Sequence, residues 1–456
     1  MSRLNDLLAD AAKRSATYLD RLQDRAVGPS AHAVDGLARL DVPLQQQPLD
    51  PREVLRELDE IVSPATMAMA GPRFFGFVIG GSLPAALAAN MLASAWDQNT
   101  GLYNVTPGTA KLEQVALRWL LDALHLPAHC AGAFVTGTTV AHITSLAAAR
   151  HAVLAKAGWN VEADGLFGAP PITVVVSDEV HPTLLKALGV VGLGRNRVTR
   201  VPTDAQGRMR LDAFPKLHGP AIVCVQAGNV NTGACDPVAE LCDLAQPSGA
   251  WVHVDGAFGL WARVAPSRAH LVAGVERADS WATDGHKWLN VPYDSGIAIT
   301  RDGEALRKAM AVTAEYLPSE TSNRNPADHT PELSRRARGV DIWAAMRSLG
   351  REGLAELIER NCRQARRFAE GLAAAGVEVL ADVALNQVLV SFGSPEQTHR
   401  VIAAIQAEGT CWAGATVWQG RTAMRISVCS WATTDADVER SLQAMIRAGR
   451  AVGTGE

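Results

Sequence analysis

The middle of the chain alternates between short, almost wholly apolar runs and longer segments with helical periodicity. The apolar runs span residues 133–135, 172–177, 221–226, 251–254, 280–283 and 296–300. The helical patterns span residues 110–124, 140–155, 182–188 and 237–244. Strands that are apolar throughout are buried on both faces, and strands that alternate with helices form parallel sheets. The pattern therefore predicts an α/β fold with a mainly parallel sheet in a large domain over residues 86–332.

The two ends of the chain follow different patterns. Helical periodicity at residues 4–22 and 51–61 predicts a helical arm over residues 1–85. Two helices this short cannot bury their own apolar faces, so the arm packs on the body or wraps a second subunit, and we favour the second. A long helical stretch runs from residue 333 to 375. The strands and helices that follow predict a small α+β C-terminal domain over residues 333–456.

Composition narrows the class of protein. The 456 residues are 48% hydrophobic and 20% charged, which is typical of a soluble globular protein. The formal net charge of -4 gives no reason to expect nucleic acid or an anionic membrane as a partner. No apolar run reaches the roughly 18 residues of a membrane-spanning helix. The seven scattered cysteines lack any Cys-x-x-Cys pair, which favours a reducing cytoplasm and argues against a structural zinc site.

One lysine and one aspartate lie where chemistry is expected. Asp255 ends the run WVHVD, and Lys287 follows His286 in a turn of small residues after the run at 280–283. A pyridoxal phosphate enzyme needs a lysine amine that forms an imine with the cofactor aldehyde. It also needs an acid that holds the proton on the ring nitrogen, so that the ring can accept electrons. The alternative is an ordinary exposed lysine, so the rest of the chain decides.

Other polar residues also follow apolar runs. Thr136–Thr139 lie between a run and a helix, where helix N–H groups and hydroxyls bind anions, although a plain helix cap is the alternative. His181 follows the next run, with a capping or core histidine as its alternative. The segment at 228–232 follows the third. Ligands bind at the C-terminal ends of strands in such sheets, so the convergence of these residues predicts a cofactor site there.

Five segments, SDEVHPTLLKA, AGNVNTGACDP, WVHVDGAFG, ADSWATDGHKWL and LSRRARGVDIWAAMRSLGREGL, carry a family resemblance. The chain resembles the group II pyridoxal-phosphate-dependent amino acid decarboxylases, which include the aromatic L-amino acid, glutamate and tyrosine decarboxylases. The resemblance implies an aspartate aminotransferase-like fold (fold type I), pyridoxal 5'-phosphate as cofactor and decarboxylation of an L-amino acid to its amine. It also implies a homodimer with the active site at the subunit interface.

The resemblance implies a role for each matching residue. Lys287 forms the internal aldimine with the cofactor, Asp255 pairs with the ring nitrogen, and His181 stacks on the ring. Tyr316, in a long loop that runs to residue 332, protonates the α-carbon after carbon dioxide leaves. The remaining cofactor contacts are Thr138 and Thr139 at the phosphate, helped by His286, with Ala257 under the ring and Asn229 beside it.

Three positions depart from the family pattern. Val140 replaces a glutamate, Asn229 a threonine and Asp341 a lysine. None of the three touches imine formation, so the resemblance still predicts a decarboxylase. The alternatives are another enzyme on the same fold (an aldehyde-forming variant, a carbon–carbon lyase or an aminotransferase) and a catalytically silent scaffold. Tyr316 counts against the aldehyde-forming variant, and the intact lysine and aspartate count against the scaffold.

Overall fold

The computed structural model describes residues 2–312 and 323–453. The described parts of residues 1–79, 367–380 and 389–456 form one compact unit, the first unit. Those of residues 80–366 and 381–388 form the second unit. These units gather stretches that are distant in sequence. The predicted division into residues 1–85, 86–332 and 333–456 follows chain order instead and stays a prediction.

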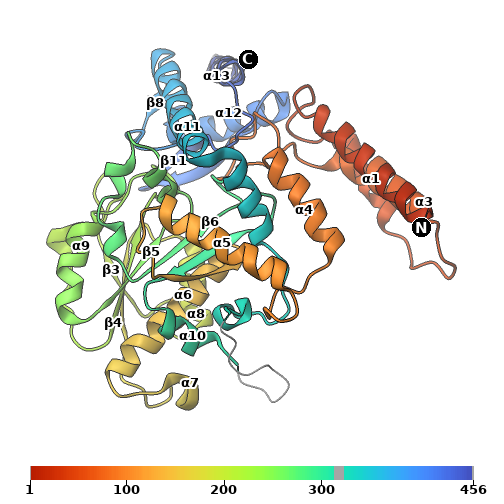
Figure 1. Ribbon diagram of the computed structural model, residues 1–456. Coiled ribbons are helices and arrows are strands. Elements are labelled where there is room, and N and C mark those ends of the chain that lie inside the picture. The colour runs from red at the N-terminus through yellow and green to blue at the C-terminus, as the bar shows by residue number, and fades with distance from the viewer. Residues whose placement is uncertain (1, 313–322, 454–456) are drawn as a thin grey trace. The chain divides into compact units, whose positions relative to one another are not determined.

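A seven-stranded sheet forms the centre of the second unit (Figure 1). Its strands lie in the order β1-β7-β6-β5-β4-β2-β3. Strand β7 is antiparallel to both of its neighbours, and the remaining neighbours pair in parallel, which confirms the predicted mainly parallel sheet. The strands are β1 (Ala131–Val135), β2 (Thr173–Ser177), β3 (Val198–Val201), β4 (Ala221–Gln226), β5 (Trp251–Asp255), β6 (Ser280–Asp284) and β7 (Gly296–Thr300).

The register of this sheet places three strand ends side by side. Gln226, the last residue of β4, lies opposite Asp255, the last residue of β5. Asp255 in turn lies opposite Ala282, two residues before the end of β6 at Asp284. Polar side chains at these ends are therefore neighbours, although they come from positions up to about sixty residues apart in the chain.

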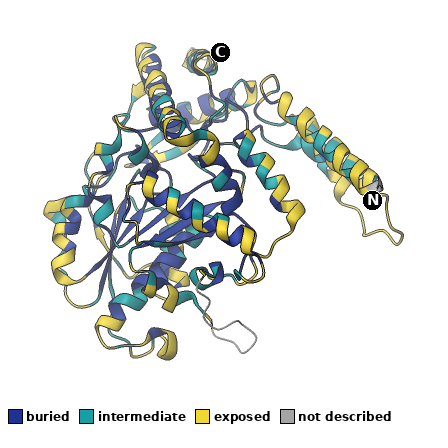
Figure 2. Cartoon of the chain, viewed as in Figure 1, coloured by how far each residue is buried: buried dark blue, intermediate teal, exposed yellow. Residues whose placement is uncertain are grey.

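Helices cover the sheet of the second unit. They are α4 (Pro84–Trp96), α5 (Pro107–Ala123), α6 (Thr138–Lys156), α7 (Val161–Asp164), α8 (Pro182–Val190), α9 (Val238–Ala245), α10 (Gly303–Met310) and the greater part of α11 (Gly339–Ala374). Helix α6 contacts β4, β5, β6 and β7. Most of its residues are buried, including the polar His142, Thr144 and Ser145, and the strands that it contacts are buried in Figure 2.

The first unit combines N-terminal helices with a small sheet. Its helices are α1 (Ser2–Asp20), α2 (Ala31–Asp35), α3 (Pro51–Glu57), α12 (Pro395–Glu408) and α13 (Asp435–Gly453). A four-stranded sheet in the order β10-β11-β9-β8 comprises β8 (Glu378–Val379), β9 (Gln387–Ser391), β10 (Gly414–Trp418) and β11 (Arg421–Ser427). The rings of Phe74 and Phe77 stack on Trp412, with ring centroids 5.1 and 5.9 Å away. This C-terminal sheet with its helices confirms the predicted small α+β lobe.

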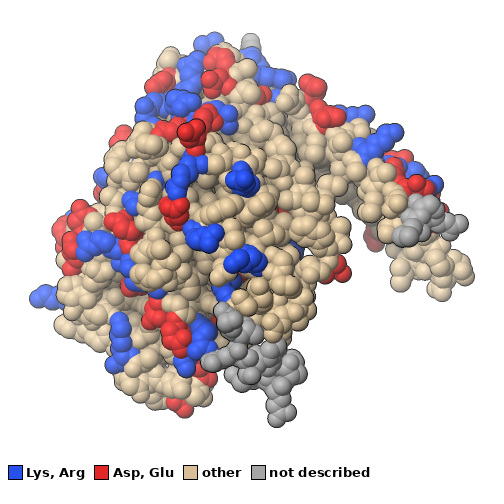
Figure 3. All heavy atoms as spheres, viewed as in Figure 1, with Lys and Arg blue, Asp and Glu red and all other residues tan. Residues whose placement is uncertain are grey.

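The surface carries both signs of charge. Figure 3 shows Lys and Arg side chains interspersed with Asp and Glu on the face in view. Over the described residues, no helix combines the length and the apolar character needed to cross a membrane.

Candidate active site

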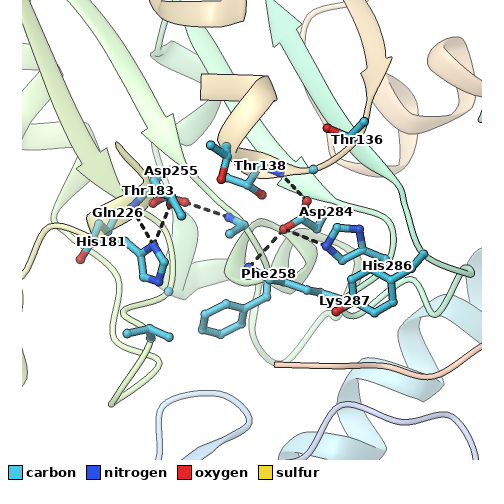
Figure 4. A pocket seen from close by; sticks show the side chains of 16 residues that line it. Thr136, Thr138, His181, Thr183, Gln226, Asp255, Phe258, Asp284, His286 and Lys287 are labelled. Atoms are coloured by element: carbon cyan, nitrogen blue, oxygen red, sulfur yellow. Dashed lines mark hydrogen bonds and ion pairs between the residues drawn. The ribbon is translucent and has the colours of Figure 1, made fainter. Parts of the chain in front are cut away.

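A cavity of about 360 Å³ lies at the C-terminal ends of the central strands in the second unit (Figure 4). Its walls bring together most of the predicted site residues. The described residues that line it are Thr136, Gly137, Thr138, Thr139, His181, Thr183, Gln226, Gly228, Val230, Asp255, Ala257, Phe258, Asp284, His286, Lys287 and Tyr293. The turn predicted to bind an anion, at residues 136–139, therefore shares one cavity with the two predicted histidines, the aspartate and the lysine.

Asp284 connects the start of α6 with Lys287. Its carboxylate accepts the backbone N–H of Thr138 at 2.6 Å, at the start of α6. Its other oxygen lies 3.1 Å from Lys287 Nζ, and only 3% of its side chain is exposed. An anion is stabilised at a helix N-terminus and beside an ammonium group, so Asp284 fixes the turn after β1 and the lysine together. This role was not predicted from the sequence, although Asp284 ends a strand three residues before Lys287.

His286 is held as a neutral ring against Tyr293. Its Nδ1 accepts the backbone N–H of Ser295 at 3.0 Å, so the ring proton lies on Nε2, 3.6 Å from the Asp284 carboxylate. Burial lowers the pKa of His286, and the nearby Lys287 ammonium lowers it further, whereas Asp284 acts in the opposite direction. The ring stacks on Tyr293 at a centroid distance of 4.3 Å. His286 thus offers an N–H donor without carrying a charge at neutral pH.

Asp255 remains an anion despite being buried. Burial acts to raise its pKa, but His142, His181 and Lys287 outweigh burial and hold the pKa of Asp255 well below its usual range. One carboxylate oxygen accepts the backbone N–H of Ala257 at 3.2 Å, and the other lies 3.4 Å from His142 Nε2. The end of β5 therefore presents a fixed negative charge to the cavity.

His181 both caps a helix and lines the cavity. Its Nδ1 accepts the backbone N–H of Thr183 at 3.3 Å at the start of α8, and the Thr183 hydroxyl lies 2.7 Å from the same nitrogen. The capping alternative considered from the sequence is thus present together with the cavity position. With Nδ1 engaged by a donor, the ring proton of a neutral His181 lies on Nε2. Figure 4 shows His181 on the same side of the cavity as Asp255.

The turn at Thr136–Thr139 has the features of an anion site. Helix α6 begins at Thr138, and its N-cap residue, Gly137, forms no side-chain cap hydrogen bond. The Thr138 hydroxyl is buried and has no hydrogen-bond partner among the described residues. A Cβ at Gly296 would lie 2.3 Å from Gly137 Cα. Strand β7 therefore requires glycine at its first position, where the turn packs against it. Helix N–H groups and unused hydroxyls at one place suit a phosphate.

Two predicted site residues are not part of the described cavity wall. Gly228 and Val230 line the cavity, but Asn229 between them does not. Its side-chain oxygen accepts the backbone N–H groups of Asn231 and Thr232 at 2.8 and 3.3 Å, which stabilises the turn after β4. Tyr316 lies outside the described residues. The cofactor contact of Asn229 and the proton transfer by Tyr316 stay predictions.

Comparisons with known proteins identify the family of this chain. The family model described as the pyridoxal-dependent decarboxylase conserved domain matches residues 35–394. Tryptophan decarboxylase 1 of Oryza sativa subsp. japonica is 28% identical over 431 residues, which cover 86% of this chain and 82% of that protein. Phenylacetaldehyde synthase of Petunia hybrida is 26% identical over 349 residues, which cover 72% of this chain and 67% of that protein.

Solved structures share the whole fold. The crystal structure of Oryza sativa TDC with PLP and tryptamine superposes with a TM-score of 0.91, covering 99% of this chain and 98% of that chain. At 24% sequence identity, this likeness shows the fold.

The donors and acceptors of the cavity fit the cofactor that the family uses. Pyridoxal phosphate has an aldehyde, a ring nitrogen and a phosphate. The cavity offers a lysine amine, a buried carboxylate and a helix N-terminus with an unused threonine hydroxyl. No metal-ligating cluster of three or more His, Cys, Asp or Glu side chains occurs among the residues that the structure covers.

Replacing Asp284 with Ala is expected to lower the free energy of unfolding by about 2 kcal/mol or more, because it leaves the Thr138 N–H and the Lys287 ammonium without their shared acceptor. Urea unfolding followed by circular dichroism measures this loss. Asp243→Ala is the matched control, since it also removes a carboxylate paired with a cation but 65% of that side chain is exposed. Equal losses in the two variants would contradict a central role for Asp284.

Proposed function

The chain belongs to the pyridoxal-dependent decarboxylase family, and from this premise we propose that it converts an aromatic L-amino acid into the corresponding amine and carbon dioxide. The observation that carries the proposal is that the Lys287 amine and the Asp255 carboxylate face one cavity, beside an anion site at the start of α6. In the overall reaction a proton replaces the carboxylate on the α-carbon. No oxidant or reductant is consumed.

Two observations support an aromatic substrate. Tryptophan decarboxylase 1 and phenylacetaldehyde synthase, both related in sequence, carry names that refer to aromatic compounds. In addition, none of the described residues that line the cavity is an arginine, and Lys287 is the one lysine among them. A substrate with a carboxylate on its side chain would lack a cationic partner there, whereas the rings of Phe258 and Tyr293 offer apolar contact.

The residues of the cavity divide the work of the reaction. When bound, pyridoxal phosphate supplies an electron-withdrawing ring that takes up the electron pair of the bond that breaks. Lys287 would hold the cofactor aldehyde through Nζ, and Thr138 and Thr139 would hold the phosphate. Asp255 would keep a proton on the ring nitrogen, because its fixed negative charge favours the protonated form.

The remaining assignments concern orientation and proton delivery. We assign His181 and Ala257 to the two faces of the cofactor ring and His286 to its phosphate, since all three line the cavity. Tyr316 would deliver the proton that replaces the carboxylate on the α-carbon. General acid work of this kind depends on contact distance, so the tyrosine must reach the cavity during turnover.

Product analysis tests the proposed reaction. Purified protein with added pyridoxal phosphate is given L-tryptophan, L-tyrosine, L-phenylalanine, L-glutamate and L-aspartate, and mass spectrometry measures amines, aldehydes and keto acids. We expect amine from at least one aromatic substrate, because the described residues that line the cavity include no arginine, and no lysine besides Lys287, to bind a second carboxylate. Lys287→Ala should form none. Lys308→Ala, which removes a lysine that is 58% exposed, should behave as the wild type.

Other outcomes of this panel would contradict the proposal in different ways. Amine from an acidic substrate alone would refute the aromatic assignment and leave decarboxylation in place. Aldehyde or keto acid as the main product would move the protein to another reaction on the same fold. Full activity in Lys287→Ala would remove the lysine from the mechanism, provided that its circular dichroism spectrum matches the wild type.

Replacing Tyr316 with Phe is expected to lower the yield of amine and raise the share of aldehyde. Without the phenol as proton donor, the substrate that has lost its carboxylate would leave by oxidative deamination, with dioxygen as the oxidant, or by transamination, and both routes give an aldehyde. Mass spectrometry of products together with an oxygen electrode measures the change. Tyr18→Phe, which removes a phenol hydrogen-bonded to Thr66 at 2.8 Å in the first unit, is the control. An unchanged amine yield in the Tyr316 variant would exclude the tyrosine as proton donor.

We further propose that the chain functions as a homodimer. Large apolar side chains are exposed within each unit: Leu4 and Leu8 on α1 are 58% and 57% exposed, and Met91 and Leu92 on α4 are 52% and 56% exposed. Such faces support burial against a second copy. Mass photometry is expected to give twice the chain mass, and Leu4→Glu with Leu8→Glu should shift the population towards monomer. A wild-type protein that stays monomeric at micromolar concentration would contradict the dimer.

A further inference from the structure

Four buried side chains extend from Asp255 in a continuous line that does not border the cavity. His142 Nε2 lies 3.4 Å from the Asp255 carboxylate, and His142 Nδ1 lies 2.8 Å from His253 Nε2. His253 Nδ1 lies 2.8 Å from the Ser280 hydroxyl, which also accepts the indole N–H of Trp251 at 2.8 Å. His142, His253 and Ser280 are 0% exposed, and Trp251 is 5% exposed. We call this set the histidine relay.

The secondary structure explains why these residues meet. Trp251, His253 and Asp255 alternate along β5, so their side chains project from the same face of the sheet. Ser280 starts β6 and lies opposite His253 in the register of the two strands. Helix α6 packs against both strands and supplies His142. Two histidines and a serine thus occupy positions that an apolar core would otherwise fill.

Trp251 at one end of the relay can only donate, and the Asp255 carboxylate at the other end can only accept, so these two ends favour one direction for the hydrogen bonds between them. The indole of Trp251 can only donate, so the Ser280 oxygen accepts from it and can pass its own proton towards His253 Nδ1. A neutral His253 then carries its proton on Nε2 and donates to His142 Nδ1. A neutral His142 likewise carries its proton on Nε2, which faces Asp255. All four donors therefore point towards the carboxylate.

The opposite direction fits the surroundings poorly. If His142 carried its proton on Nδ1, the lone pair of Nε2 would face the Asp255 carboxylate. Reversal would also make Ser280 accept from both the indole and His253, which leaves its own hydroxyl proton without an acceptor in the relay. Burial, together with the neighbouring His142, lowers the pKa of His253 to about 3, although Asp255 acts in the opposite direction. His253 is consequently neutral at physiological pH, as the relay requires.

The charged and titratable groups around Asp255 come from several elements. His142 lies on α6, His181 precedes α8, Lys287 follows β6 and Cys224 lies on β4. Burial and Asp255 itself raise the pKa of the Cys224 thiol, so Cys224 stays neutral. Lys287 and His181 line the cavity and are the groups that a bound cofactor would contact, whereas His142 does not. His142 is thus the neighbour of the carboxylate that stays in place when the cavity fills.

We propose that the histidine relay is a positioning device that holds His142 Nε2 beside Asp255 Oδ2, at 3.4 Å, and so orients the carboxylate. The Ala257 N–H holds the other oxygen. The relay rests on the proposed function in one respect, because the benefit of a fixed carboxylate is the proton that it keeps on the cofactor ring nitrogen. His142 acts through Asp255 and contacts neither substrate nor cofactor.

Nitrogen NMR of the full chain, selectively labelled with ¹⁵N-histidine in a deuterated background, tests the relay directly. Signals are assigned with His142→Gln and His253→Gln. Both rings are expected to carry a proton on Nε2 and a lone pair on Nδ1, the arrangement that the relay requires. A ring of the pair that carries its proton on Nδ1, or on both nitrogens, would overturn the proposal. The nitrogen signals report directly which ring nitrogen carries the proton.

Addition of pyridoxal phosphate gives a second reading of the same spectra. The His142 Nε2 signal is expected to shift on binding, because its acceptor then shares its charge with the ring nitrogen. His329 is the control: it is half-buried, its Nδ1 lies 3.2 Å from the backbone oxygen of Asn325, and it should not shift. A His142 signal that stays unchanged while the cofactor binds would contradict the relay.

Variants at position 142 separate positioning from packing. His142→Leu should weaken cofactor binding about ten-fold, because it removes the buried polar neighbour that lies 3.4 Å from the Asp255 carboxylate. His142→Gln, whose amide retains one donor and one acceptor, should recover most of the affinity. Thr144→Val is the matched control on α6, since its hydroxyl is bonded to Val140 within the helix. Equal affinity in the Leu variant and the wild type would refute the proposal.

The outcomes distinguish the relay from the proposed function. Correct histidine tautomers in a protein that forms no amine would retain the relay and remove the decarboxylase proposal. Amine formation by a protein in which either histidine carries its proton on Nδ1 would retain the decarboxylase proposal and remove the relay. If the Leu variant does not fold, the wild-type spectra still decide, since they need no turnover and use the Gln variants only to assign the signals.

Discussion

The buried carboxylate of Asp284 is the constraint on which the geometry of the cavity depends. It bonds the first N–H of α6 and the Lys287 ammonium at once, with 3% of its side chain exposed. A buried anion without partners would be costly, so the turn after β1 and the turn after β6 must both stay in contact with it. This single group therefore sets the distance between the expected phosphate site and the expected cofactor lysine.

The parallel sheet supplies the second half of the arrangement. Asp255 and Asp284 end neighbouring parallel strands, and each is fixed by its own set of donors. One carboxylate engages the lysine and the helix, while the other is supported from behind by His142. The cavity thus has an anion at two of its walls and a cation between them. Such fixed charges need no reorganisation when a polar group of the cofactor arrives.

Much of the fold and of the site could be predicted from the sequence because it depends on local pattern. The apolar runs became strands, and residues that follow those runs share a sheet edge, which brought Thr138, His181, Asp255 and Lys287 to one cavity. Strands β3 and β10 were missed because both are edge strands, in which exposed residues interrupt the apolar run. Apolar periodicity carries little information about such strands.

The residues that the sequence did not reveal act through distant partners. Asp284 resembled one more polar residue beside the lysine, and nothing in its neighbours predicts a bond to Thr138, 146 positions away. His142 lies within an apolar helix, where a lone histidine usually belongs to the core. Only the packing of α6 on β5 shows that it reaches Asp255 and His253. The alternation of Trp251, His253 and Asp255 along one strand was the available signal.

If Lys287 holds the cofactor, chemical trapping places the bond on that residue. The protein is incubated with pyridoxal phosphate, reduced with borohydride, digested and analysed by peptide mass spectrometry. We expect one major modified peptide, with the phosphopyridoxyl group on Lys287, and its disappearance when inorganic phosphate and a substrate amino acid compete during incubation. Modification spread over exposed lysines such as Lys308, with Lys287 unmodified, would contradict the account.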